Sequence, residues 1–292
     1  GRLTEQNPED EPAEALLERI QKEKQRLYDE GEIRKPKTHK PVQDDETFDL
    51  PDTWKWVRLG EVGDTQTGQT PKKSNDSFYG GSYPFLKPGN IKSNKVSYSG
   101  ETLTEEGIED GRRVPSGSVL MVCIGTIGKI ALVNRECSCN QQINYITPFA
   151  PLLEEFIITA MKSPHFQKEA LKRSNSTTIT ILNKGNWEKI PVPIPPLAEQ
   201  KRIVATVDRL MEECDALEAT HIQMREVQSA ATVSAAHALH TAPDEDALRT
   251  AWSRVESHID TLTATPDAVD ELRQTILQLA VQGRLTEQNP ED

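Results

Sequence analysis

The longest hydrophobic pattern in the sequence begins after Pro195 and Pro196 and continues to about Ala238. Its apolar residues recur at alternating steps of four and three, which is the heptad spacing of a coiled-coil helix. Proline lacks an N–H and suits the first turn of a helix, where Glu199 would complement the positive end of the helix dipole. A helix of about 40 residues would extend roughly 60 Å. One apolar stripe of that length predicts a partner helix.

Two shorter heptad patterns follow, over residues 248–262 and 266–279. Asp244 is the expected N-cap of the first, after Pro243, and Pro266 begins the second. Short connections predict antiparallel helices that fold back on one another. The residues predicted to pack between helices, or between two copies of the chain, are Leu197, Ile203, Val207, Leu210, Leu217, Met224, Leu248, Trp252, Val255, Ile259, Leu262, Leu272, Ile276 and Leu279.

The N-terminal part predicts one helix, over residues 11–30, which ends at Gly31. Residues 34–46 are charged and proline-bearing with almost no apolar content, which is typical of a linker.

Residues 48–195 change to short strand-type runs, separated by turns that contain glycine and proline. These runs are 54–59, 83–86, 95–98, 118–124, 129–133, 142–147 and 188–194, with helical turns expected near 152–162 and 165–174. The pattern predicts an α+β fold, in which a domain with a mainly antiparallel, barrel-like sheet is joined to long, antiparallel, coiled-coil-like helices. We therefore expect three regions: 1–46, 47–195 and 196–292.

Residues 1–10 and 283–292 are the same ten letters, Gly-Arg-Leu-Thr-Glu-Gln-Asn-Pro-Glu-Asp. Ten identities at two places in one chain indicate one period of a larger repeat, with a cloning artefact as the alternative. The second copy begins at Gly283, where the preceding helix needs a left-handed residue after its last turn.

The formal net charge of −12 argues against nucleic acid for the chain as a whole. Residues 51–195, however, hold 17 basic and 14 acidic residues, a balance of +3. The remaining residues hold 17 basic and 32 acidic residues, a balance of −15. An acidic helical frame therefore carries a mildly basic middle domain, which is compatible with DNA binding by that domain.

Catalytic and metal-binding motifs are missing from the sequence. Residues 125–129 resemble a phosphate loop, but Cys123 stands where the Walker spacing needs glycine. His237 and His240 have metal-ligand spacing on a helix, although surface histidines are the simpler interpretation. The four cysteines lack zinc-finger spacing, and no nucleophile motif is present. We predict a chain that is not an enzyme and holds no metal or cofactor.

A membrane location is also not expected. No stretch approaches 18 apolar residues, and the N-terminus lacks a signal-peptide pattern, so we expect a cytoplasmic protein.

Loops of the middle domain combine amide, hydroxyl and lysine side chains. Asn and Gln can pair bidentately with adenine, whereas Lys, Ser and Thr contact phosphates. Solvated turns are the alternative interpretation for each loop. The candidate DNA-contacting residues are Thr67, Gln69, Lys72, Lys73, Ser74, Asn75, Lys87, Asn90, Lys92, Lys129, Gln141, Gln142, Asn175, Ser176, Thr177 and Thr178.

Several runs resemble one known family, in the order in which that family carries them. They are Leu-Pro-Asp-Thr-Trp-Lys-Trp-Val-Arg-Leu-Gly at 50–60, Gly-x-Thr-Pro at 68–71, Tyr-Pro-Phe-Leu at 83–86, Ile-Pro-Val-Pro-Ile-Pro-Pro-Leu-Ala-Glu-Gln-Lys-Arg-Ile-Val at 190–204, and Gln-Thr-Ile-Leu-Gln-Leu-Ala-Val-Gln-Gly-Arg-Leu at 274–285. The chain resembles a half-length specificity subunit of a type I restriction–modification system. It differs in having one target recognition domain and one conserved helical region, where the family usually has two of each.

The resemblance implies a non-catalytic subunit that reads double-stranded DNA. Its partners would be methyltransferase subunits, which bring S-adenosylmethionine and methylate adenine, and a restriction subunit. We expect two copies to pair through their helices as a homodimer and to read an interrupted, palindromic site, with the helices setting the spacer. Two alternatives remain: a self-contained DNA methyltransferase, and a structural coiled-coil adaptor.

Overall fold

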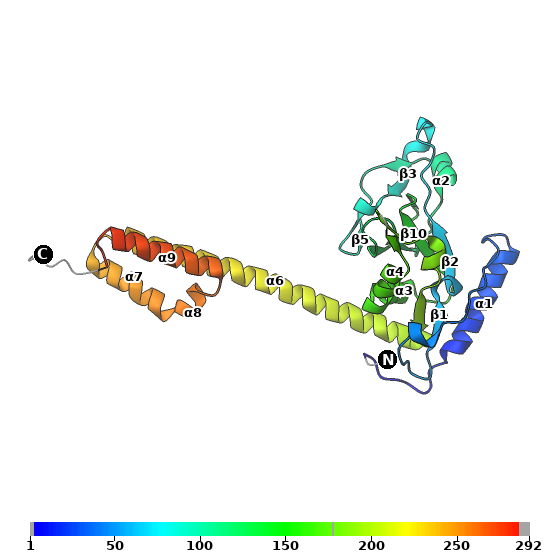
Figure 1. Ribbon diagram of the computed structural model, residues 1–292, viewed down its shortest axis with the longest axis horizontal. Helices are drawn as coiled ribbons and strands as arrows, with labels where there is room; N and C mark the ends of the chain where they lie inside the picture. The colour runs from blue at the N-terminus through cyan, green and yellow to red at the C-terminus, as the bar shows by residue number, and fades with distance from the viewer. Residues whose placement is uncertain (1–2, 177, 286–292) are drawn as a thin grey trace, which may run out of the picture. The chain divides into compact units, whose positions relative to one another are not determined.

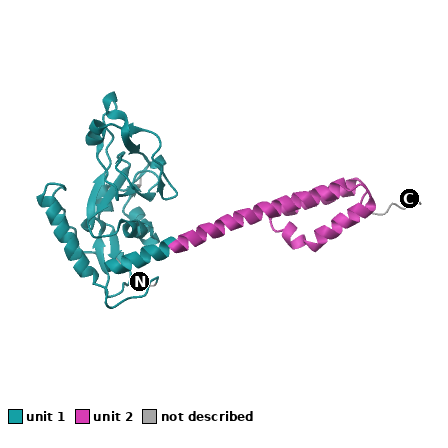
Figure 2. Cartoon of the chain, turned by 180° about the vertical axis from the view of Figure 1, so that it is seen from behind, with its two compact units in different colours: residues 1–208 teal, residues 209–292 magenta. Residues whose placement is uncertain are grey.

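The computed structural model describes residues 3–176 and 178–285. The chain divides into two compact units, Gly1–Asp208 and Arg209–Asp292, drawn in teal and magenta in Figure 2. The boundary falls inside one continuous helix, α6 (Leu197–Thr241), which has 45 residues. The sequence placed the long helix at about 195–238, in close agreement.

The first unit is an α+β fold, as expected (Figure 1). Its helices are α1 (Ala13–Asp29), α2 (Glu105–Gly111), α3 (Glu154–Lys162), α4 (Pro164–Lys172), α5 (Lys184–Trp187) and the start of α6. Its strands are β1 (Lys55–Arg58), β2 (Gly63–Thr67), β3 (Tyr79–Leu86), β4 (Ile91–Lys92), β5 (Lys95–Val96), β6 (Thr102–Leu103), β7 (Val119–Val122), β8 (Ile130–Leu132), β9 (Ser138–Cys139), β10 (Ile143–Pro148), β11 (Asn175–Ser176), β12 (Thr180–Ile181) and β13 (Pro191–Ile194).

The main sheet has four antiparallel strands in the order β2-β10-β7-β8. It is not a closed barrel, which corrects the expectation from the sequence. Strands β2 and β8 are its edges, and the other described strands form separate small sheets with the orders β1-β13, β6-β3-β9, β4-β5 and β11-β12. Pairing is antiparallel except between β3 and β9. Closure is unnecessary because other elements cover both faces: helices α1, α3 and α4 with β13 on one, and the small sheets that contain β3, β4, β5 and β9 on the other.

Both faces of the sheet are buried, which explains the continuous apolar run of β7. Val119 and Met121 point into a core shared with α3 and α4, whereas Leu120 and Val122 point into a second core. Strand β2 escaped the sequence analysis because its residues, Gly-Asp-Thr-Gln-Thr, are polar. It is a strand because it pairs with β10 along its whole length.

The N-terminal helix α1 belongs to the first unit. Ala13, Leu16 and Ile20 are fully buried in the larger core, together with Trp54 and Trp187. Gly31 ends the helix with a φ of 77°, in the left-handed region.

Arg58 makes the largest number of contacts that hold the linker after α1. Arg58 donates hydrogen bonds to the carbonyl oxygens of Lys40 and Pro41, and it forms an ion pair of 2.6 Å with Glu46. Arg173 binds the other oxygen of Glu46. A segment with almost no apolar residues is thus fixed by buried charge.

The beginning of α6 is anchored by polar side chains. Gln200 is fully buried; it donates to Pro195 O and accepts from Leu153 N. Glu199 accepts from Trp54 Nε1 over 2.8 Å and from Thr4 Oγ1 over 3.0 Å.

The first copy of the ten-residue repeat is bound at this place. Gln6 also donates to Glu199, and Arg202 forms an ion pair of 2.6 Å with Asp10. In the second copy, residues 286–292 lie outside the described residues.

In the second unit, the C-terminal part of α6 packs with α7 (Glu245–Ser257), α8 (Ile259–Leu262) and α9 (Pro266–Val281). Three predictions about these helices are confirmed. Asp244 caps α7 by accepting from Ala247 N, Pro266 is the first residue of α9, and Gly283 follows α9 with a φ of 69°.

The predicted packing residues fall into three groups. Leu239 forms a core with Val255, Leu262, Leu272 and Leu279, and Leu248 and Trp252 pack against it, so six predicted positions do pack between helices. The remaining positions behave differently.

Leu197, Ile203 and Val207 pack into the core of the first unit and not against another helix of the tail, which corrects the prediction for an intrachain helical seam. Leu210, Leu217 and Met224 have exposed fractions of 36%, 64% and 53%, and Ile259 and Ile276 are also exposed. Helices α7–α9 pack along the C-terminal part of α6, where Thr232, Ala236 and Leu239 are buried.

Candidate nucleic-acid interface

The candidate DNA-contacting residues other than Lys129 form four groups in chain order, at 67–75, 87–92, 140–142 and 175–178. These groups lie around the 140–142 turn, which precedes the central strand β10. Thr70 Oγ1 donates to Gln141 Oε1 over 2.7 Å, joining the loop after β2 to this turn. Asn140 N donates to Leu86 O, at the start of the loop that contains Lys87. Cys123 N donates to Gln142 O, at the start of the loop that leads to Lys129.

The fourth group joins through β12. Gly125 N donates to Thr180 O over 3.0 Å, and Ile124 forms a β-bridge with Ile181. Five loops, at residues 67–75, 87–92, 123–129, 140–142 and 175–182, are therefore brought together, and we call them the loop cluster. The sequence spacing alone did not show this proximity, because the loops are separated by up to about a hundred residues.

The loop after β2 approaches the 140–142 turn with no space between the backbones. A Cβ atom added to Gly68 would lie 2.3 Å from Asn140 O and 2.4 Å from Cys139 O. Thr67 Oγ1 donates to Asn144 Oδ1 over 2.8 Å, so its hydroxyl is directed into the sheet. Glycine at position 68 is thus required by close packing.

Helix α2, which the sequence analysis did not predict, supports the same loop. Gln69 Nε2 donates to Asp110 O, and Lys72 N donates to Asp110 Oδ2 over 3.0 Å. The side chains of Lys72 and Lys73 are exposed, and so is Ser74. Asn75 Oδ1 accepts hydrogen bonds from Ser77 N and Ser77 Oγ, which commits it to the local turn.

The second group contributes less to a binding surface than its composition suggests. Asn90 Oδ1 accepts from Lys87 N, and Asn90 Nδ2 donates to Ser97 O and Ser99 O, so its amide shapes the turn. Lys87 Nζ lies 2.6 Å from Glu101 in an ion pair. Lys92 is exposed on the β4–β5 hairpin.

In the fourth group, Asn175 and Ser176 form β11, and Thr178 is exposed in the turn to β12. Thr177 lies outside the described residues. The exposed fractions of Ile179 and Ile181 are 55% and 41%, so apolar side chains stand beside these polar ones.

Exposed lysines give the loop cluster positive charge. In the described ranges, Lys72, Lys73, Lys92 and Lys129 are exposed and have no carboxylate partner in an ion pair. Gln141 is exposed and Gln142 half-buried. The cluster thus presents amide side chains of one turn among lysines from three loops, a combination that can contact base edges and phosphates.

The three cysteines of the first unit, Cys123, Cys137 and Cys139, are buried thiols, and all four cysteines of the chain are free. Burial raises the pKa of Cys123 and of Cys137 to about 12 each, which keeps these thiols protonated at neutral pH. Among the described residues, no group of three or more His, Cys, Asp or Glu side chains could hold a metal ion. Within the same ranges, no helix combines the length and the apolar content that crossing a membrane requires.

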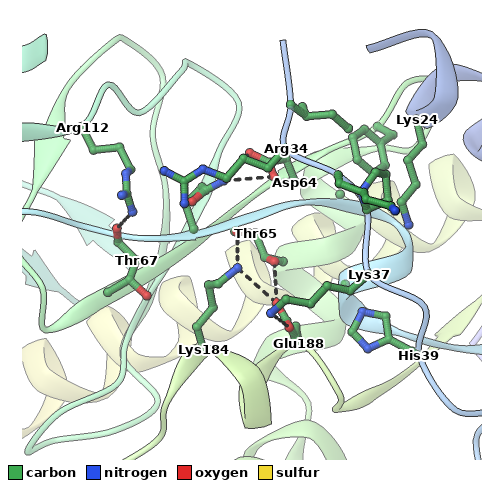
Figure 3. A pocket seen from close by; sticks show the side chains of 17 residues that line it. Lys24, Arg34, Lys37, His39, Asp64, Thr65, Thr67, Arg112, Lys184 and Glu188 are labelled. Carbon is green, nitrogen blue, oxygen red and sulfur yellow. Dashed lines mark hydrogen bonds and ion pairs between the residues drawn. The ribbon is translucent and has the colours of Figure 1, made fainter. Parts of the chain in front are cut away.

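A second feature of the first unit was not found from the sequence. A pocket of about 330 Å³ lies between α1, the linker and β2, and many of its lining side chains are basic (Figure 3). The lysine- and proline-rich composition of the linker could have pointed to this pocket. Composition alone, however, identifies such a segment only as an exposed linker.

Comparison with known proteins identifies the class of protein that this architecture represents. Residues 51–224 match the family model described as the type I restriction modification DNA specificity domain. The chain belongs to this family.

Two relatives from Escherichia coli are similar over much of the chain. The type I restriction enzyme EcoEI specificity subunit is 28% identical over 310 residues, covering 100% of this chain and 50% of the relative. The EcoAI specificity subunit is 30% identical over 228 residues, covering 74% of this chain and 38% of the relative. The chain thus spans half or less of the length of these relatives.

A solved structure shows the same fold. It is described as the structural basis underlying complex assembly and conformational transition of the type I R-M system. The TM-score is 0.50 at 24% identity, and the match covers 72% of this chain and 52% of that chain.

Proposed function

We propose that the chain is a non-catalytic DNA-reading subunit, in which the loop cluster contacts one half of a bipartite target site. The observation that carries this proposal is the loop cluster itself, in which three loops contact the 140–142 turn and a fourth contacts the 123–129 loop, with Gln141 exposed. Amide side chains of that turn would contact base edges, and Lys72, Lys73 and Lys129 would neutralise phosphates.

Partner subunits would carry out the catalysis. In this proposal the chain assembles with methyltransferase subunits, which hold S-adenosylmethionine and methylate adenine, and with a restriction subunit in a larger complex in the cytoplasm. A second copy of the chain would bring the other recognition domain. The two copies would be related by a twofold axis, and their site would be an interrupted palindrome.

The lysines provide the test of this function. Each lysine that contacts a phosphate contributes about 0.9 to the slope of log affinity against log salt concentration for duplex DNA. We expect Lys72→Ala and Lys129→Ala each to weaken DNA binding and to reduce that slope by about one, as measured by fluorescence anisotropy of the methyltransferase complex over a salt series.

Lys168→Ala is the matched control, because Lys168 is an exposed lysine on α4 outside the loop cluster. The target for the titration comes from methylation mapping in cells that carry the subunit and its methyltransferase. If both variants keep the wild-type affinity and salt slope, the loop cluster is not the DNA-binding surface.

A further inference from the structure

The basic pocket beside the linker is bounded by four elements of the first unit. Figure 3 shows Lys24 entering from α1, Arg34 and Lys37 from the linker, and Lys184 from α5, with Thr65 of β2 between them. Ile33 and Phe149 provide apolar wall. The pocket is therefore a formed cavity and not a row of lysines on a convex surface.

Positive charge exceeds negative charge in this pocket. Its lining has six lysine and arginine side chains against two carboxylates, Asp64 and Glu188, in a chain whose net charge is −12. Glu188 is already satisfied: it forms ion pairs of 2.6 Å with Lys37 and 3.3 Å with Lys184, and it accepts from Thr65 Oγ1 over 3.0 Å. The surplus charge is thus carried mainly by Lys24, Arg34 and Lys35.

Lys24 is the unusual member of this group. Its exposed fraction is only 8%, and no described residue gives its ammonium group a hydrogen bond or an ion pair. Burial lowers the pKa of Lys24, with Glu61 opposing the effect from a distance. The Lys24 Nζ atom is itself accessible from the pocket, because it is not among the buried side-chain atoms without a hydrogen-bond partner. An anion bound in the pocket would therefore pair with this ammonium group and offset the cost of the desolvation that lowers its pKa.

His39, which also lines the pocket, is affected by the charges of both signs around it. The pKa of His39 is lowered first by burial, and the charges of Lys24 and Lys37 lower it further, against the opposing effects of Glu188 and Glu61. Lys24 and Lys37 therefore lie close enough to His39 to affect the same region of the pocket.

We propose that this pocket binds a phosphate group, with the unpaired Lys24 ammonium as its inner partner and Arg34 and Lys35 at its mouth. A phosphate oxygen is a strong acceptor that can pair with an ammonium group, and guanidinium groups bind phosphate through two parallel hydrogen bonds. The site does not depend on the loop cluster reading DNA. The phosphate could come from a nucleic-acid backbone or from a free phosphorylated molecule.

Thermal unfolding of the complete chain in inorganic phosphate tests this site, against sodium chloride at the same ionic strength. We expect phosphate to raise the wild-type Tm above the chloride value, because a ligand that binds only the folded state stabilises it. Lys24→Met keeps the apolar stem and removes the charge. This variant should be more stable than wild type in chloride, and it should lose the phosphate-dependent rise.

Lys22→Met is the matched control on the same helix, because Lys22 is exposed, and it should keep the full response. Arg34→Gln should weaken phosphate binding about tenfold in isothermal titration, without the gain in stability. A wild-type chain with no phosphate response, or a Lys24→Met chain with the wild-type response, would overturn the proposal.

Competition identifies the source of the phosphate. Displacement of phosphate by a 12-base-pair duplex of arbitrary sequence would assign the site to a DNA backbone, and displacement by adenosine monophosphate alone would assign it to a free nucleotide. If neither displaces it, the pocket does not bind phosphate esters, and the proposal fails. Because these titrations need no cognate target, failure of sequence-specific DNA binding would leave their outcome unaffected.

Discussion

Gly68 shows how one residue positions the candidate DNA-binding loops. Its Cα lies so close to the carbonyl groups of Cys139 and Asn140 that any side chain would separate the two loops. The hydrogen bond between Thr70 and Gln141 depends on the same approach.

We expect Gly68→Ala to lower the free energy of unfolding by about 1–3 kcal/mol, the usual cost of forcing extra volume into a packed site. DNA affinity should fall as well, because the two loops would move apart. Chemical denaturation and DNA titration measure the two effects. Gly89→Ala is the control, since a Cβ there has no neighbour within 4 Å. Unchanged stability in Gly68→Ala would contradict the close packing.

Glu46 is a second residue whose role depends on its partners. Hydrogen bonds from Arg58 lower the pKa of Glu46 to about 2, from an ordinary value of 4.5, with further help from Gln43 N and Arg173. Its side chain has an exposed fraction of 13%, so solvent screens these contacts only partly. A carboxylate with a lowered folded-state pKa stabilises the fold above pH 4.5, and this contribution is lost as the pH falls from 4.5 towards 2.

Glu46→Gln should therefore destabilise the chain by on the order of 2–3 kcal/mol at pH 7. The difference from wild type should shrink between pH 4.5 and pH 2. Urea denaturation over that pH range measures it, with Glu18→Gln, an exposed carboxylate on α1, as the control. A pH-independent difference would mean that the ion pairs of Glu46 are not its source.

At the scale of elements, α6 has three consecutive environments. Its first turns are buried in the first unit through Glu199, Gln200 and Ile203, and its last turns are buried by α7–α9. Between them, every residue from 208 to 227 is exposed. Leu210, Leu217 and Met224 are exposed there, and no described element of the chain covers them. An apolar stripe on a helix is normally buried against another surface.

If this exposed part sets the spacer, its length can be changed without changing the loop cluster. Inserting seven residues after Met224 preserves the heptad phase and adds roughly 10 Å of helix. We expect the spacer between half-sites to lengthen by about three base pairs, with both half-sites unchanged. Methylation mapping measures both quantities. An altered half-site would show that the helix also affects base reading.

At the scale of the whole molecule, we propose that a second copy of the chain covers the exposed apolar positions of α6. The chain has one recognition domain and spans about half the length of the specificity subunits that it resembles, so a second copy could supply the missing half. Pairing of two α6 helices would bury the predicted positions that the chain by itself leaves exposed.

We expect Leu217→Glu to weaken self-association at least tenfold, because a buried unpaired carboxylate in a helix seam costs several kcal/mol. Sedimentation equilibrium of the chain, alone and with its methyltransferase, measures the mass. Ile222→Glu is the control, since Ile222 is also exposed but lies off the heptad seam. A wild-type chain that stays monomeric in both states would exclude the homodimer.

The sequence alone determined the elements whose signals are local. Heptad spacing located α6, the capping chemistry of Asp244 and Pro266 located α7 and α9, and alternating turns and apolar runs indicated the α+β domain. The motifs around residues 190–204 identified the family. Each of these signals depends on residues that are near one another in the sequence, so the sequence alone contains the interactions that produce it.

The tertiary structure decided what depends on contacts between distant residues. Strand β2 is polar and exists only through pairing with β10, and Asn90, a candidate base reader, is committed to its own turn. The burial of Lys24 follows from packing of α1 on the sheet, which no local pattern encodes. The same heptad seam is buried at both ends of α6 and exposed between them, because helix spacing specifies an apolar face but not the surface that covers it.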